Sequence, residues 1–154
     1  MPALNFQKQF APAILAGRKP FTLRALRKDG RDPKAGQPLY LFTAMRTKQC
    51  RKIAEKQCKF AVTISLSWRC VTIATIGMLL KDSELESFSR LDGFNSYDEF
   101  SRFHEVHMLM ENKQMRLISW VTRDELKEML EPKNVCYKPG TCHCPACWLE
   151  RQSE

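Results

Sequence analysis

Lys19, Thr22, Arg24 and Asp92 are the residues whose types and spacing could carry chemistry. Thr22 offers a hydroxyl, which is inert at its own pKa and needs a base close by. Lys19 precedes it by three residues, and partial desolvation beside the cationic Arg18 and Arg24 would depress the pKa of this lysine. A neutral Lys19 could then remove a proton from Thr22 or from water. Asp92 could orient a substrate amino group or protonate a leaving amine, and Arg24 could bind a phosphate or stabilise developing negative charge.

Each of these residues also has a simpler structural interpretation. Gly17 could be only the C-cap of a helix, Lys19 a solvated loop lysine, and Thr22 an ordinary strand residue. Asp92 and the glycine after it could form a turn, and Arg24 could hold Asp92 in a structural ion pair. Residue types alone leave a shared pocket and these separate roles both open.

The order of two motifs favours a shared pocket. Gly17 to Arg24 form the pattern G-x-K-x-x-T-x-R, between an expected short helix and an expected strand. Residues 92–100, DGFNSYDEF, are similar to D-G-F-x-S-x-E-E-F. Together these motifs resemble those of the ASCH domain, a PUA-like β-barrel family associated with RNA. The resemblance covers roughly residues 4–121, and it includes the apolar residues that lead into Gly17, which are Phe10, Ile14, Leu15 and Ala16.

This resemblance implies a particular chemistry. By motif, the most similar characterised proteins are small bacterial N4-acetylcytidine amidohydrolases, in which a Lys, a Thr and a later Glu are functional. The Lys and Thr correspond to Lys19 and Thr22 as catalytic residues. Apart from the resemblance, Arg24 and Arg18 are candidate substrate-binding residues because of their charge beside Thr22 and Lys19. The Glu position falls on Asp92, which is one methylene shorter, and a misplacement of ~1 Å can cost ~100-fold in rate. Amide hydrolysis of an N4-acylated cytidine and non-catalytic RNA binding therefore both remain candidate functions.

The charge distribution indicates an anionic partner. The formal net charge is +8. Residues 1–60 carry 14 basic and 3 acidic side chains, whereas residues 61–154 carry 11 and 14. A basic half favours nucleic acid or a nucleotide, although it could also be a merely solvated surface. The basic loop at residues 27–38 supplies the candidate nucleic-acid contacts, which are Arg27, Lys28, Arg31 and Lys34.

The C-terminal tail has the composition of a metal site. Its four cysteines follow the spacing C-x5-C-x-C-x2-C, and they are Cys136, Cys142, Cys144 and Cys147. Four thiolates can close a tetrahedral zinc site, and His143 is an alternative ligand. This zinc would be structural, and catalysis would need no cofactor. The alternative is a flexible tail with redox-prone thiols, and a third candidate function is partner binding through a zinc-stabilised tail.

The other cysteines and histidines suggest no site. Cys58 and Cys70 border strand segments and are interpreted as small buried hydrophobes. Cys50 lies among cations that would lower its thiol pKa, but a passive surface cysteine is the favoured interpretation. His104 is interpreted as a satisfied core or boundary histidine, because no third partner completes a catalytic set with it.

Periodicity and capping residues place the elements. We expect helices over residues 6–16, from Ser96 onward, and from Thr122 to the proline at 132. The first becomes regular near residue 10 or 11, and the second has a core stripe of Phe100, Phe103, Val106 and Met110. The expected strands cover residues 21–26, 38–43, 60–66, 70–80 and 115–121, and residues 46–59 could be helical.

These elements predict an α+β fold, a PUA-like small curved sheet or β-barrel flanked by helices. Residues 1–131 form this domain, and residues 132–154 form the cysteine-rich extension. The sequence has no apolar run of membrane-spanning length, and its N-terminus lacks the features of a signal peptide. We therefore expect a cytoplasmic protein with reduced thiols that binds RNA or a modified nucleoside and no membrane.

The tail motif gives the first testable prediction. Protein purified without added zinc should contain one zinc per chain, and the site should weaken below about pH 6 as the thiolates take up protons. Elemental analysis and titration with a thiol reagent measure both. A chain without stoichiometric metal, whose four tail thiols all react freely, would contradict the zinc site.

Overall fold

The computed structural model describes residues 2–81, 83–106 and 112–130. Its strands form two sheets. The three-stranded sheet has the order β1-β3-β4, with bounds Ala3–Phe6, Pro38–Thr43 and Arg51–Gln57. The five-stranded sheet has the order β2-β8-β5-β6-β7, with bounds Phe21–Ala25, Lys113–Ser119, Phe60–Ser67, Cys70–Ile73 and Met78–Leu80. The α-helices are α1 (Ala11–Leu15), α2 (Ser83–Leu91), α3 (Tyr97–Phe103) and α4 (Arg123–Leu130), and the 3-10 turns are η1 (Lys8–Phe10) and η2 (Ala74–Ile76).

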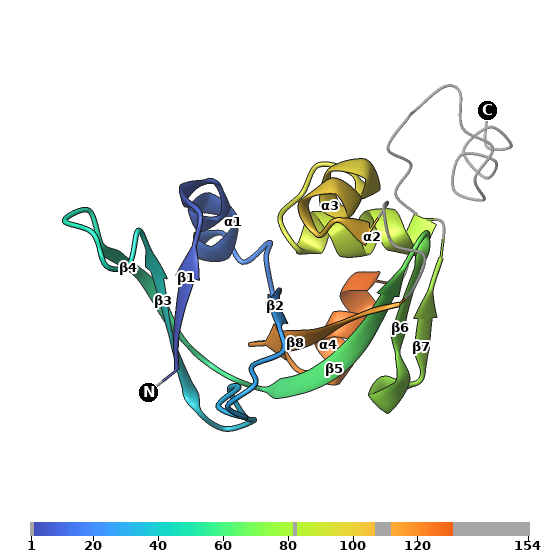
Figure 1. The fold of residues 1–154 in the computed structure, drawn as a ribbon, viewed down its shortest axis with the longest axis horizontal. Coiled ribbons are helices and arrows are strands. Elements are labelled where there is room, and N and C mark those ends of the chain that lie inside the picture. The colour runs from blue at the N-terminus through green and yellow to red at the C-terminus, as the bar shows by residue number, and fades with distance from the viewer. Residues whose placement is uncertain (1, 82, 107–111, 131–154) are drawn as a thin grey trace, which may run out of the picture.

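The expected α+β class is confirmed. β1 pairs in parallel with β3, and the other pairings are antiparallel. The described strands form two open sheets, which do not close into one barrel by strand pairing. Figure 1 shows the long β5 curving beneath the helices, with β1, β3 and β4 to one side. No helix in the described part of the chain is long and apolar enough to span a membrane.

The core lies between the five-stranded sheet and the helices. Every second residue of β5 is buried, from Phe60 to Leu66, as its sequence alternation predicts. Phe21 of β2 stacks on Phe88 of α2 with 4.8 Å between ring centroids, which fixes this helix over the edge of the sheet. α2 also contacts both α3 and α4. This packing positions the end of α2 beside the start of β2.

Residues 46–59 are not helical, so that prediction was wrong. The segment contains β4, an edge strand that pairs with β3 and half-buries Ile53 and Ala54. Lys and Glu favour a helix locally, but pairing with β3 overrides that preference. The expected strand over residues 70–80 is divided by η2 and Gly77. Phe6 belongs to β1 rather than to the first helix, whose regular part begins at Ala11 as expected.

Two helices end in the same glycine motif. At the end of α1, the Gly17 N–H donates to Ile14 and the Arg18 N–H donates to the carbonyl of Ala13. At the end of α2, the Gly93 N–H donates to the carbonyl of Arg90, and the Phe94 N–H donates to the carbonyl of Ser89. Both glycines are left-handed, with φ of +75° at Gly17 and +99° at Gly93, as a Schellman ending requires. These turns direct the chain immediately before Lys19 and immediately after Asp92.

The two glycines differ in the space around them, which yields a prediction for stability. A Cβ on Gly17 would meet nothing within 4 Å, whereas one on Gly93 would lie 2.6 Å from Cδ1 of Phe10. Gly17→Ala should lower the free energy of unfolding by about 1–2 kcal/mol, the cost of the left-handed conformation. Gly93→Ala should lower it by more, because the ring must also move. Urea unfolding of both variants measures the difference, and equal losses would contradict the close packing at Gly93.

Candidate active site

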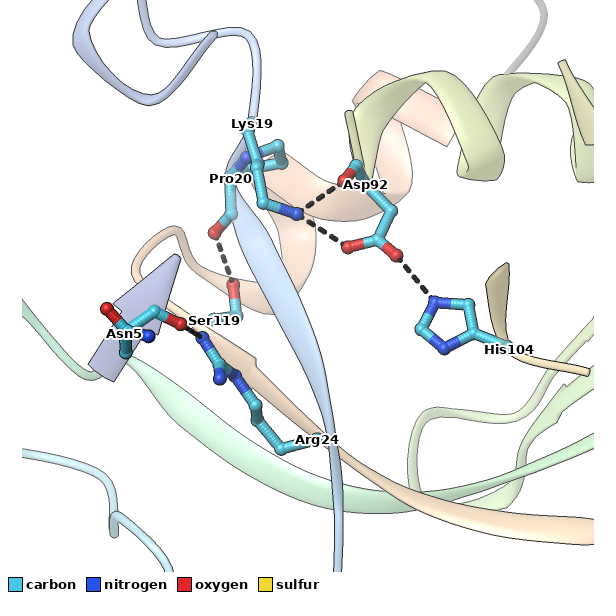
Figure 2. A network of polar contacts seen from close by, with 7 residues as sticks. All are labelled: Asn5, Lys19, Pro20, Arg24, Asp92, His104 and Ser119. Atoms are coloured by element: carbon cyan, nitrogen blue, oxygen red, sulfur yellow. Dashed lines mark hydrogen bonds and ion pairs between the residues drawn. The ribbon is translucent and has the colours of Figure 1, made fainter. Parts of the chain in front are cut away.

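A buried ion pair joins the two motifs. The Lys19 Nζ donates to Oδ1 of Asp92 at 2.6 Å and also to the main-chain carbonyl oxygen of Asp92 (Figure 2). The residues are 2% and 3% exposed. Because Asp92 caps the C-terminus of α2, the lysine places its positive charge where the helix dipole favours a cation. This pair connects the segment after α1 with the end of α2.

The surroundings of Lys19 disfavour its charge. Burial lowers the pKa of its ammonium below the usual value, and the Asp92 carboxylate partly offsets that effect. The Nζ also lies 5.0 Å from the ring centroid of Phe10 and 6.0 Å from that of Phe21. These rings exclude water while their faces attract the cation. Lys19 is therefore not the solvated loop lysine of the simpler interpretation.

His104 completes the network, a role that the sequence did not predict. Its Nε2 lies 3.2 Å from Oδ2 of Asp92, and its ring packs against Phe94, Phe100 and Phe103. An ionised carboxylate can only accept, so Nε2 must carry the proton in this hydrogen bond. As expected, His104 is buried and its ring has a hydrogen-bond partner. That partner is Asp92, which belongs to the site. The only sequence signal of His104 is a position one helical turn after Phe100.

Thr22 and Arg24 project from the same face of β2, because strand side chains alternate. Thr22 is buried, and no described residue hydrogen-bonds to its hydroxyl. The Nη2 of Arg24 donates to the Asn5 carbonyl at 2.6 Å, and the guanidinium lies 4.8 Å from the Phe6 ring centroid. Burial lowers the pKa of Arg24, and Asp92 acts in the opposite direction. Arg24 forms no ion pair with Asp92, so the structural pair considered from sequence is not present.

These side chains line one cavity of about 260 Å³. The polar lining comes from both motifs, from the C-cap of α3 and from β1 and the residue after it, and consists of Lys19, Thr22, Arg24, Asp92, His104, Asn5 and Gln7. The aromatic lining consists of Phe6, Phe10, Phe94 and Phe103. Phe103 was predicted to lie in the core but is 48% exposed, because the helix ends there and leaves its ring at the edge of the cavity. Arg18, predicted to bind substrate, is exposed and does not line this cavity.

The basic loop lies apart from this cavity. Arg27, Lys28, Arg31 and Lys34 are all exposed, and none of them lines the cavity. Arg27 makes two hydrogen bonds to the Asp29 carboxylate, at 3.1 and 2.9 Å, so part of the loop's charge is neutralised locally. The role of this loop in nucleic-acid binding stays a prediction.

The predicted zinc ligands Cys136, Cys142, Cys144 and Cys147, the alternative ligand His143, and the core residue Met110 lie outside the described residues. Within the described part, no group of three or more His, Cys, Asp or Glu side chains is arranged to hold a metal. Cys50 is exposed, Cys58 is buried and Cys70 is half-buried, and all three are free thiols.

Searches of protein-family models, curated proteins and solved structures returned no match to this chain. Function is therefore inferred from the site.

The buried pair predicts strong coupling between two substitutions. Asp92→Asn alone should lower the free energy of unfolding by about 3–5 kcal/mol, because it leaves a buried ammonium without its carboxylate. Lys19→Met alone should also destabilise, since it removes the principal donor to Asp92. The double variant should lose clearly less than the sum of the single losses. Urea unfolding of the four proteins measures this coupling, and additive losses would show that the pair contributes nothing as a pair.

Proposed function

We propose that this chain is an ASCH-type, PUA-like domain that binds a modified nucleoside and hydrolyses the exocyclic amide of an N4-acylated cytidine. The observation that carries the proposal is the meeting of Lys19, Thr22 and Asp92 in one cavity, although Lys19 and Asp92 are 73 residues apart. In this proposal, the strands of the two open sheets correspond to the strands of a PUA-like barrel.

The cavity suits a nucleobase. At about 260 Å³ it is smaller than the ~300–1,000 Å³ of pockets that hold drug-sized ligands. Phe10, Phe94 and Phe103 offer ring faces and edges to a planar base. Lys19, Asp92 and His104 offer charged and hydrogen-bonding groups for its polar edge. A small cavity lined by both aromatic and polar side chains supports recognition of a base and its exocyclic nitrogen.

The Lys19–Asp92 pair can supply both a base and an acid. Transfer of the shared proton gives a neutral Lys19 amine and a protonated Asp92, and burial lowers the pKa of Lys19 in the direction of this transfer. Lys19 then takes a proton from water as the water oxygen bonds to the acyl carbon, and its new ammonium stabilises the oxyanion. The C–N bond breaks as the cytidine nitrogen takes the proton of Asp92. The products are a carboxylic acid and cytidine, and the pair returns to its ionised state.

Thr22 is the alternative nucleophile. Its hydroxyl is free of hydrogen bonds to the described residues and lines the same cavity as Lys19. Attack by Thr22 would release cytidine and leave an ester on its oxygen, which water would cleave in a second step. Although Asp92 has a shorter side chain than Glu, its Oδ1 lies 2.6 Å from the Lys19 Nζ, which supports a shared role for these two residues.

One observation favours the second candidate, a module that binds a modified nucleoside in RNA without hydrolysing it. Lys19 donates to two oxygens of Asp92. A lysine held as an ammonium in this way recognises a ligand carbonyl but does not accept a proton. Partner binding through a zinc-stabilised tail stays a prediction from the sequence.

Incubation with N4-acetylcytidine separates these candidates. The ultraviolet absorbance should change as the amide is cleaved, and Lys19→Ala should reduce kcat/KM by about 100-fold or more. Lys81→Ala, which removes an exposed lysine outside both the cavity and the basic loop, is the matched control and should leave the rate unchanged. Thr22→Val leaves the buried pair intact, so a loss of activity there that Thr22→Ser restores would identify the hydroxyl as a participant.

Two results would contradict the reaction. Equal rates for the wild type and a folded Lys19→Ala variant would remove the lysine from the chemistry. Saturable binding of N4-acetylcytidine without any turnover would favour the non-catalytic module.

A further inference from the structure

Two arginines face each other across β2 and β8 without a counterion. The strand register places Arg24 directly opposite Arg116, and opposed residues in an antiparallel pair have Cβ atoms roughly 5 Å apart. Among the described residues, neither guanidinium forms an ion pair with a carboxylate. Like charges in this arrangement repel each other. The pair is therefore an unneutralised positive site within the sheet.

Each arginine also has an unused donor. The Nε atoms of Arg24 and Arg116 are buried and have no hydrogen-bond partner among the described residues. Arg24 uses Nη2 on the carbonyl of Asn5, and Arg116 makes a long contact of 3.4 Å from Nη1 to Thr63. A buried donor without an acceptor is costly, so such groups call for an explanation. Arg116 lines neither the cavity nor the groove that adjoins it, so Arg24 is the residue placed to meet an anionic ligand, with the charge of Arg116 behind it.

Arg24 connects the cavity to a second hollow. It lines the cavity with Lys19, and with Asn5 it also lines an adjoining groove of about 590 Å³. Thr22 and Arg24 are two residues apart on one strand face, so their Cα atoms are separated by about 7 Å. A group that extends from a base beside Thr22 would therefore meet Arg24 as it enters the groove.

The groove carries further positive charge. Arg46 and Arg27 line it, together with the acidic Asp32. Arg27 is already paired with Asp29, whereas Arg46 is exposed and has no ion pair among the described residues. The loop before Arg46 is fixed by a hydrogen bond from the Met45 N–H to Oδ1 of Asn5. Among the described residues that line the groove, Arg24 and Arg46 are thus the arginines without an ion pair.

We propose that Arg24, reinforced by Arg116 and with Arg46 along the groove, forms a phosphate subsite. The ligand is a nucleotide whose base enters the cavity and whose phosphate accepts hydrogen bonds from Arg24. This inference rests on the proposed function for the placement of the base. Arginine is suited to the role because its planar donors match two phosphate oxygens at once. The phosphate belongs either to a mononucleotide or to an RNA strand.

Calorimetric binding of reaction products tests this subsite without turnover. The ligands are cytidine, cytidine 5′-monophosphate, cytidine 3′-monophosphate and the trinucleotide CCC. A monophosphate should bind about tenfold to hundredfold more tightly than cytidine, as expected for a charged hydrogen bond. Arg24→Gln should remove that gain, Arg24→Lys should keep part of it, and Arg116→Gln should reduce it. Arg123→Gln, which removes an exposed charge from α4, is the matched control, and thermal unfolding checks that each variant is folded.

The outcomes separate the subsite from the proposed reaction. A phosphate gain that depends on Arg24 supports the subsite even if N4-acetylcytidine is never hydrolysed. A further gain for the trinucleotide identifies an RNA strand, and equal binding of trinucleotide and monophosphate identifies a mononucleotide. Hydrolysis of N4-acetylcytidine with no gain from either phosphate overturns the subsite alone. Absence of binding by all four ligands overturns the subsite and removes the basis for the base cavity.

Discussion

The buried contact between Lys19 and Asp92 is the interaction on which the site depends. An ammonium and a carboxylate lose hydration when they are buried, and only their mutual contact and further hydrogen bonds compensate for it. Asp92 achieves this by accepting from both Lys19 and His104. Removal of any one of these groups leaves the others with unsatisfied polar atoms. The site is consequently rigid, and its geometry follows from the fold rather than from the ligand.

The backbone supplies the precision that this contact needs. Gly17 and Gly93 end α1 and α2 in the same way, with a left-handed turn two residues before Lys19 and directly after Asp92. At Gly93 the Phe10 ring occupies the space of a missing Cβ, which brings η1 and the end of α2 into direct contact. Two local rules of helix termination thus determine a contact between distant parts of the chain.

The sequence predicted most reliably what local patterns control. The alternation of β5 and the capping boxes at Ser96 and Thr122 are present, with reciprocal hydrogen bonds between Thr122 and Glu125. It did not predict β1 or α2, and it favoured a helix where β4 lies, because that strand is stabilised mainly by its partner. The motifs predicted four polar residues of the cavity, which are Lys19, Thr22, Arg24 and Asp92. They did not predict His104, since its role arises only when α3 packs against the end of α2.

The order of the chain has a consequence for its synthesis on the ribosome. β2 carries Thr22 and Arg24, and among the described strands it pairs only with β8, which begins at Lys113. The nascent chain therefore cannot complete this strand pair, or bury Lys19 against Asp92, until most of the domain has emerged. During that interval, an apolar strand edge and an unpaired lysine remain exposed. The ligand site therefore forms late, when the core closes. A translation product that ends before Lys113 would lack β8 and the complete site.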